Sequence, residues 1–266
     1  MKQFSLAYLT VPGINPVDQI ALAKDAGFDY VSLRTIPMGL PGEPPVCLER
    51  DPDLACAIRD KLRETGMKLL DIELVRIRED LPSDYRGAFE QGAKLGATQV
   101  LSSVWTQEYA FAVDRLGMIC EQANEFGLTI NLEFPIVSGL TTLADTVKIQ
   151  DKVNAPNLKI LMDMIYVYWG KVTPEDIRAL EPERFGLIHL CDCPKEINTE
   201  FMQVVREGRA YCGEGAVDLA GLLKALPDNP CSIELPNIKR IAELGAAGHA
   251  ARCLDTAKAY CLQHGL

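Results

Sequence analysis

The chain repeats one pattern of hydrophobic and polar positions: an amphipathic helical stretch, a glycine, and then a short apolar run. The pattern is clearest around Gly27, Gly66, Gly96 and Gly127, which are 39, 30 and 31 residues apart. A glycine suits the left-handed conformation that ends a helix. Apolar runs without alternation are typical of parallel strands that are buried on both faces. The spacing therefore predicts successive strand–helix units.

The same alternation continues with less regular joints over the rest of the chain. Besides those after the glycines, the pattern predicts strands at Phe4–Leu9, Leu158–Asp163, Phe185–Leu190 and Cys231–Leu235. It predicts helices at Asp53–Thr65, Ser83–Leu95, Arg115–Glu125, Thr142–Val153, Asp218–Ala225 and Ala247–Gln263, and a helix start at Thr173–Glu175. Eight strands alternating with helices predict an α/β fold, a (β/α)8 TIM barrel formed by residues 1–266 as a single domain. A doubly wound open sheet is the alternative.

Two long stretches follow strands without fitting the repeat, Thr35–Asp51 and Cys191–Val217. We expect both on the face that holds the carboxyl ends of the strands, where TIM barrels build their active sites. The length of 266 residues suits one barrel, and 48% apolar residues provide a large core.

The net charge and the cysteines indicate which binding partners and which cellular compartment to expect. A net charge of −10 without a dense run of Lys or Arg argues against binding to nucleic acid or to anionic membranes. The first residues lead directly into a short apolar run, so we expect neither a signal peptide nor a transmembrane segment. Nine cysteines without regular spacing fit a reducing cytoplasm better than a disulfide scaffold.

Ionisable residues stand at the ends of the last four predicted strands: Glu133, Asp163, His189 and Glu234. Side chains alternate along a strand, so all four are expected to point inward at the mouth of the barrel. Three carboxylates there would repel one another unless protons or a cation neutralised them. One divalent metal ion does so most simply, and three oxygens with one imidazole nitrogen suit Mn²⁺ (manganese), Mg²⁺, Co²⁺ or Zn²⁺.

Each of these residues taken alone has a simpler explanation. A single Glu at the end of a strand is more often a salt-bridge partner, and a lone His in an apolar strand is more often a hydrogen-bonded core residue. Four such residues at the ends of four successive strands favour a metal site.

On these residues the chain resembles the xylose isomerase-like barrel superfamily, and within it the sugar phosphate isomerase/epimerase group that includes D-tagatose 3-epimerase and inosose dehydratase. The metal ligands of the family are Glu, Asp, His and Glu on strands five to eight, which match Glu133, Asp163, His189 and Glu234 in order. The resemblance covers most of the chain and is specific from Asn131 onward.

The resemblance also implies residues that hold the substrate. Arg209, followed by Gly213 and Gly215, is similar to an arginine in the family that binds substrate oxygens, and Asp192 matches a family acid in the same loop. Two positions differ from the ketose epimerases. Tyr166 replaces a histidine three residues after the strand-six Asp, and Gly139 replaces a second Glu six residues after the strand-five Glu.

The family's chemistry implies an isomerase or epimerase of a small keto-sugar or sugar derivative, acting by proton transfer through a metal-stabilised enediolate. By the same resemblance, Glu133 and Glu234 would be both ligands and the catalytic acid/base pair. Other polar or aromatic residues predicted at the mouth are candidates for substrate contacts: Tyr8, Arg34, Glu73, Trp105 and Tyr166. Each of them could equally form a loop salt bridge, a cap or a packing contact.

Three other functions are compatible with such a barrel. A lyase, namely a dehydratase or decarboxylase of a keto-sugar acid or cyclitol, would use the same metal site. An endonuclease of the related DNA-repair branch would need many histidine ligands, whereas this chain has three histidines. A non-catalytic sugar-binding barrel is the third, and the intact ligand set argues against it. Dimers or tetramers are common in the family, and no motif here decides the oligomeric state.

Overall fold

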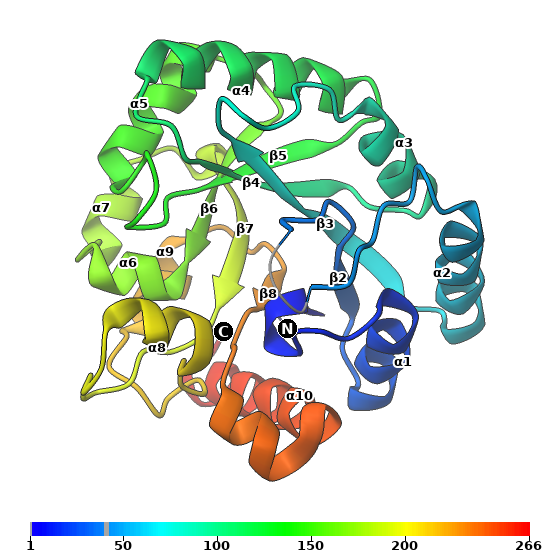
Figure 1. The fold of residues 1–266 in the computed structure, drawn as a ribbon. Coiled ribbons are helices and arrows are strands. Elements are labelled where there is room, and N and C mark those ends of the chain that lie inside the picture. Colours follow the sequence, from blue (N-terminus) through cyan, green and yellow to red (C-terminus); the bar gives the residue numbers. More distant parts are fainter. Residues whose placement is uncertain (1, 40–42) are drawn as a thin grey trace.

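Eight parallel strands close into a barrel in the order β1-β2-β3-β4-β5-β6-β7-β8, and helices surround it (Figure 1). The computed structural model describes residues 2–39 and 43–266, so Met1 and positions 40–42 of the predicted Thr35–Asp51 insertion lie outside the described residues. β8 pairs in parallel with β1 and so completes the closure. The predicted TIM barrel is confirmed, and the alternative of an open sheet is wrong.

The strands are short and almost entirely buried. They are β1 (Phe4–Leu6), β2 (Tyr30–Arg34), β3 (Lys68–Ile77), β4 (Gln99–Val104), β5 (Thr129–Glu133), β6 (Leu158–Asp163), β7 (Phe185–Leu190) and β8 (Cys231–Ile233). The α-helices are α1 (Pro16–Ala26), α2 (Pro52–Thr65), α3 (Arg86–Lys94), α4 (Tyr109–Asn124), α5 (Leu143–Val153), α6 (Met164–Trp169), α7 (Pro174–Arg178), α8 (Phe201–Glu207), α9 (Leu219–Ala225) and α10 (Ile238–His264). Two 3-10 turns are η1 (Tyr8–Thr10) and η2 (Pro182–Arg184).

Local sequence explains where these helices begin and end. The four glycines of the repeat all have a positive φ, between 68° and 98°, so the predicted left-handed positions are confirmed. Several helices begin with a side chain that accepts a hydrogen bond from the first turn, as Asn15 does for α1 and Thr142 for α5. Thr173 forms a reciprocal capping box with Asp176 at the start of α7, where the sequence predicted a helix start.

Several predicted boundaries differ from the structure; α4, for example, begins at Tyr109, six residues before the predicted Arg115–Glu125. The expected strand Phe4–Leu9 ends at Leu6, because the chain turns into η1, and the expected strand Cys231–Leu235 ends at Ile233. α10 starts nine residues earlier than the predicted Ala247–Gln263, since a non-helical Gly245 joins two helical segments there. Because Gly245 interrupts the helix, no single apolar stripe runs through both segments.

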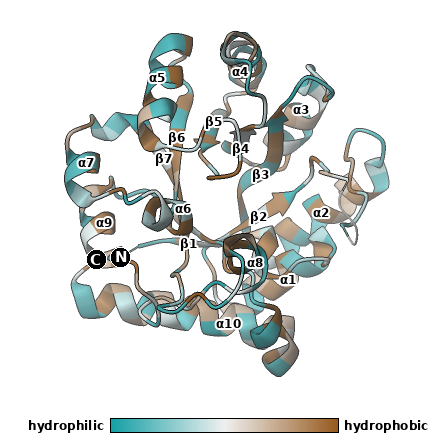
Figure 2. Ribbon diagram, turned by 60° about the vertical axis from the view of Figure 1, so that its left-hand side comes forward, coloured by the Kyte–Doolittle hydropathy of each residue, from teal (hydrophilic) through white to brown (hydrophobic). Residues whose placement is uncertain are grey.

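Two apolar regions support the barrel. The larger one lies between the strands and the surrounding helices, which carry both hydrophobic and hydrophilic residues (Figure 2). The smaller one comprises Leu70, Leu74, Leu101, Leu161 and Leu187. Leu161 lies two residues before Asp163, and Leu187 lies two residues before His189. Side chains two apart share one face of a strand, so this apolar layer lies inside the barrel beneath the polar mouth.

No helix within the described residues is both long enough and apolar enough to cross a membrane.

Gly186 on β7 shows how tightly the barrel interior is packed. A Cβ atom there would overlap Oδ1 of Asn131 and lie 2.8 Å from Cβ of Lys159. Asn131 Oδ1 accepts a hydrogen bond from the backbone N–H of Leu187 at 2.8 Å, which connects β5 to β7 beneath the mouth. A side chain at position 186 would displace this amide.

We predict that Gly186→Ala lowers the free energy of unfolding by about 1–3 kcal/mol, the usual cost of overpacking a core. The control is Gly117→Ala within α4, where a Cβ meets nothing within 4 Å. That change should leave stability unchanged or raise it by up to about 1 kcal/mol, because alanine favours a helix interior. Urea unfolding followed by circular dichroism measures both. Equal stability of the two variants would contradict this account of the interior.

Candidate metal centre

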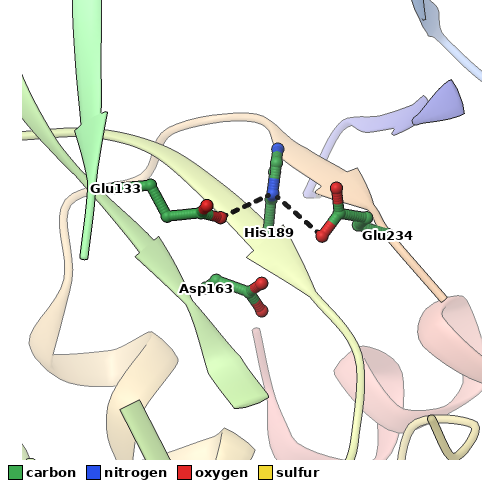
Figure 3. Close-up of side chains that lie close together, drawn as sticks. All are labelled: Glu133, Asp163, His189 and Glu234. Carbon is green, nitrogen blue, oxygen red and sulfur yellow. Dashed lines mark ion pairs between the residues drawn. The ribbon is translucent and has the colours of Figure 1, made fainter. Parts of the chain in front are cut away.

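The four predicted ligands come together at the mouth of the barrel. Glu133 ends β5, Asp163 ends β6, His189 lies on β7, and Glu234 directly follows β8. Asp163 pairs in register with His189, which in turn pairs with Ser232 two residues before Glu234. One ligand atom from each of the four residues lies within 4.8 Å of those from the others, and all four residues are buried (Figure 3). The arrangement is a candidate metal site.

The imidazole of His189 supports this assignment. Its Nδ1 atom lies 3.5 Å from Glu133 Oε1 and 3.4 Å from Glu234 Oε2, with one glutamate on each side of the ring (Figure 3). Although buried, Nδ1 has no hydrogen-bond partner. Buried polar atoms are nearly always hydrogen-bonded, so a nitrogen that faces two carboxylates without a hydrogen bond fits a ligand atom for a cation. Oxygen and imidazole donors match the divalent ions that the sequence indicated.

Arg209 closes the same cluster and is only 1% exposed. Its Nη1 atom donates to both carboxylate oxygens of Asp163 at 3.1 Å and to the backbone oxygen of Glu234 at 3.0 Å. Its Nη2 atom lies 2.9 Å from Glu234 Oε2. The thiol of Cys191 lies 3.4 Å from Nη1. One guanidinium charge thus compensates part of the negative charge of three carboxylates.

The backbone around Arg209 is held between the ends of the two strands that carry His189 and Glu234. Ala210 and Asp192 exchange two backbone hydrogen bonds of 2.9 Å after β7. On the other side, the N–H of Arg209 donates to Pro236 O at 3.1 Å, and Asn237 Nδ2 donates to Arg209 O at 2.8 Å. The long Cys191–Val217 stretch therefore folds back over the ends of β7 and β8. This course places Arg209 next to the four candidate ligands.

Asp192 holds this returning stretch. Its carboxylate accepts four backbone N–H groups, from Cys193, Gly213, Gly215 and Val217, at 2.8–3.1 Å. A Cβ at Gly215 would overlap Oδ1 of Asp192, which explains the glycine. Both oxygens of Asp192, a predicted substrate contact, are engaged by the backbone.

The burial of this cluster changes the protonation of its members. Burial raises the pKa of Glu133 and raises that of Asp163 to about 7. Burial by itself would raise the pKa of Glu234 as well. The positive charges of His189 and Arg209 have the larger effect, so the pKa of Glu234 is lowered. For His189, burial favours the neutral ring, yet Glu234 and Glu133 raise its pKa well above the usual value. Without a metal ion, protons on these groups therefore supply part of the missing positive charge.

A second polar layer lies beside the cluster, inside the barrel. Ser32 Oγ contacts Ser5 Oγ at 2.8 Å and Ser232 Oγ at 3.1 Å, and it donates to Asp71 Oδ1. Burial and the neighbouring Glu73 raise the pKa of Asp71 to about 7.

Arg34 and Glu73, two predicted substrate contacts, form a buried ion pair with 2.8 Å between Arg34 Nη2 and Glu73 Oε2. The Arg34 guanidinium also lies 3.4 Å from Glu43 and 4.5 Å from the centre of the Tyr8 ring. Tyr8 was expected on the first strand and instead lies in η1. These four residues form one group, here called the Arg34 cluster.

Tyr166 and Trp105 occupy different parts of the mouth. Tyr166 on α6 is buried, and burial, with the charges of Glu133 and Asp163, raises its pKa well above the usual value, so it lies near the ligands. Trp105 follows β4 and donates from Nε1 to Ser103 Oγ at 2.8 Å. Ser103 pairs in register with Glu133.

The loop after β5 explains one departure from the family pattern. Gly139 N–H donates to Val104 O at 2.7 Å, and a Cβ at this position would overlap the backbone oxygen of Thr106. The present course of the loop leaves no room for a glutamate side chain at position 139.

His249 on α10 is a buried contact that the sequence did not indicate as part of the site. Its Nε2 atom lies 2.9 Å from Leu235 O, and its Nδ1 atom lies 2.9 Å from Tyr211 Oη. A carbonyl only accepts, so Nε2 carries the hydrogen and Nδ1 accepts from Tyr211. The neutral ring thereby connects the segment after Arg209 to the residue after Glu234. A histidine inside an amphipathic helix gives no sequence signal for such a role.

A closed (β/α)8 barrel with a buried site of three carboxylates and one histidine defines the class of protein. The chain belongs to the xylose isomerase-like TIM barrel family, whose model matches residues 20–257. No curated protein matches the chain.

Three solved structures illustrate the likeness in fold. IOLI protein with a zinc atom has a TM-score of 0.81 at 20% identity, covering 99% of both chains. D-allulose 3-epimerase from Methylomonas sp. in complex with D-allulose has a TM-score of 0.71 at 17% identity, covering 97% of both. The probable 3-DHS dehydratase AsbF from Bacillus anthracis has a TM-score of 0.70 at 19% identity, covering 98% of both. At such identities the likeness shows the fold alone.

We predict that His249 makes stability depend on pH. Burial lowers the pKa of His249 below its usual value of 6.5. The unfolded chain therefore takes up a proton near pH 6.5 that the folded chain resists, and the stability contributed by the neutral ring is lost as the pH falls below about 6.5. His249→Gln removes this titration.

Urea unfolding of the wild type and of His249→Gln at pH 8.0 and at pH 5.5 measures the effect. The variant should be less stable at pH 8.0, and the difference from the wild type should shrink at pH 5.5. His264→Gln, at the end of α10, controls for the loss of one histidine. A difference that stays constant between the two pH values would contradict a neutral, hydrogen-bonded His249.

Proposed function

We propose that the protein is a divalent-metal-dependent isomerase or epimerase of a small keto-sugar or sugar derivative. The observation that carries the proposal is the cluster of four candidate ligands, in which the Nδ1 atom of His189 has no hydrogen bond. Three carboxylates and the Arg209 guanidinium leave a charge of minus two when His189 is neutral, which one divalent ion balances. The likeness in fold to D-allulose 3-epimerase in complex with D-allulose supports a small sugar as the substrate.

Glu133, Asp163, His189 and Glu234 would hold one Mn²⁺, Mg²⁺, Co²⁺ or Zn²⁺ ion. When bound, the ion would polarise a carbonyl group of the substrate and make the neighbouring C–H more acidic. Glu133 and Glu234 face His189 from opposite sides (Figure 3), so one carboxylate can remove the proton and the other can return it on the opposite face.

The remaining residues of the mouth would bind and orient the substrate. Arg209 is placed to donate from its guanidinium to a substrate oxygen next to Asp163 and Glu234. Tyr166 and Trp105 would border the substrate on the β5 and β6 side, and Asp192 would act by holding the segment that carries Arg209. Tyr8, Arg34 and Glu73 would meet the substrate from the side of β2 and β3.

The metal assignment predicts that the purified protein binds one equivalent of Mn²⁺. His189→Asn removes the nitrogen ligand and should weaken binding by at least about 10-fold, the loss that follows even from changing an outer partner of a ligand. His264→Asn, at the end of α10, is the matched control and should bind as the wild type does. Calorimetric titration with Mn²⁺ reads out both, and equal affinities in His189→Asn and the wild type would exclude this site.

The reaction assignment predicts that Glu234→Gln lowers the rate at which the substrate α-proton exchanges with D₂O by about 100-fold or more. Glu125→Gln, which alters an exposed carboxylate paired with Arg86, should keep full exchange. NMR of a keto-sugar panel in D₂O measures both rates, and circular dichroism verifies the fold. Undiminished exchange in Glu234→Gln would exclude this carboxylate as a base.

A lyase acting on a keto-sugar acid or cyclitol is the second candidate, favoured by the structure around Gly139. The ketose epimerases carry a substrate-binding glutamate there, for which this loop has no room. A lyase would use the same ligands and then expel a leaving group. Product mass distinguishes the two, because an isomerase or epimerase conserves mass and a lyase releases water or CO₂.

A further inference from the structure

A cavity lies at the end of the barrel opposite the candidate metal centre, where the strands begin. Its volume is about 610 Å³, which is within the usual range for sites that bind small molecules. Each strand from β2 to β7 contributes one residue near its amino end to the lining: Tyr30, Lys68, Gln99, Thr129, Lys159 and Phe185. Here the cavity is called the amino-end cavity.

The alternation of side chains along the strands explains why these residues face the interior. Four of them lie two residues before a leucine of the smaller apolar region, on β3, β4, β6 and β7. Side chains two apart share one face of a strand, so both lysines point into the barrel. On β6 the inward residues follow in the order Lys159, Leu161, Asp163. The leucines therefore lie between the amino-end cavity and the candidate metal centre.

Three side chains of the cavity offer hydrogen-bond donors. Asn131 Nδ2 donates to Gln99 Oε1 at 2.7 Å, so Gln99 is left with an NH₂ group that has no partner within the described residues. Lys159 Nζ donates to Glu183 O at 2.6 Å, and an ammonium group carries two further hydrogens. Lys68 Nζ lies 6.0 Å from the centre of the Tyr30 ring. Neither lysine forms an ion pair with a described residue.

The charge of the cavity is opposite to that of the whole chain. No Asp or Glu within the described residues lines it, although the chain carries a net charge of −10. Asp228, next to the lining residue Asn229, pairs with Lys2 at 2.9 Å. Two ammonium groups in a concave site without carboxylates attract anions. Leu70, Leu187 and other apolar lining residues add a surface that an inorganic ion would not use.

We propose that the amino-end cavity is a binding site for a small organic anion, separate from the candidate metal centre. Phosphate or carboxylate groups of the ligand accept hydrogen bonds from Lys68, Lys159 and Gln99, and its apolar part packs on the leucines and Phe185. Charge-assisted hydrogen bonds fix the anionic groups, and the buried apolar area favours an organic molecule over a free ion.

Calorimetric titration of the full chain, loaded with Mn²⁺, tests this proposal. The probes are phenyl phosphate, AMP and isophthalate, their uncharged counterparts phenol, adenosine and isophthalamide, and inorganic phosphate. We expect at least one organic anion to bind with a Kd below about 1 mM in 0.1 M salt, and at least about 10-fold more tightly than its counterpart. Equal or tighter binding of inorganic phosphate would indicate an adventitious ion only and would overturn the proposal. Binding of no organic anion would do the same.

Variants of the lining locate the bound anion. Lys68→Gln combined with Lys159→Gln removes both positive charges and should weaken binding of the best probe by at least about 10-fold. Thr129→Phe fills part of the cavity without changing its charge and should weaken binding by at least about 3-fold, which serves if the double variant does not fold. Lys148→Gln removes an exposed lysine paired with Asp145 on α5 and should bind as the wild type does. Unchanged affinity in the folded lining variants would overturn the proposal.

His189→Asn separates this site from the candidate metal centre. The variant should bind the best probe as tightly as the wild type does, because the leucines lie between the two sites. Loss of anion binding in His189→Asn, with full binding in the double lysine variant, would place the anion at the mouth of the barrel and overturn the proposal. Failure of the metal assignment shows instead as equal Mn²⁺ affinities of His189→Asn and the wild type, which leaves the anion result unaffected.

Discussion

Repulsion among three carboxylates buried at one point is the constraint on which the mouth of this barrel depends. Glu133, Asp163 and Glu234 are brought together because parallel strands end at the same rim of the barrel. Burial removes the water that would otherwise screen their charges, so positive charge must come from elsewhere. Arg209 supplies one unit, and protons supply more in the absence of a cation. The divalent ion proposed for this site would be a counter-charge that also gives His189 Nδ1 a partner.

The surrounding structure serves to hold that arrangement. Asp192 gathers four backbone amides so that the stretch after β7 turns back over the strand ends. His249 joins Tyr211 to Leu235 and thus fixes the same stretch from the side of α10. On the side of β2 and β3, Arg34 forms buried ion pairs with Glu73 and Glu43.

The sequence was sufficient to predict the barrel and the gathering of four ionisable residues at its mouth, because both follow from local periodicity. Glycines that end helices and polar residues that end apolar strands are visible without any knowledge of contacts. The sequence was insufficient for contacts between distant segments. It indicated Asp192 as a substrate contact by resemblance, whereas its oxygens bind backbone amides from residues 193–217. The contacts of His249 and the lack of space at Gly139 depend on how loops pack, which no periodicity encodes.

The most direct test of the central claim is X-ray absorption spectroscopy of the protein loaded with one equivalent of Zn²⁺. The account predicts a coordination shell of oxygen atoms with the signature of a single imidazole, from Glu133, Asp163, Glu234 and His189. A shell that contains sulfur, which the nearby Cys191 thiol could provide, or one without imidazole, would contradict it.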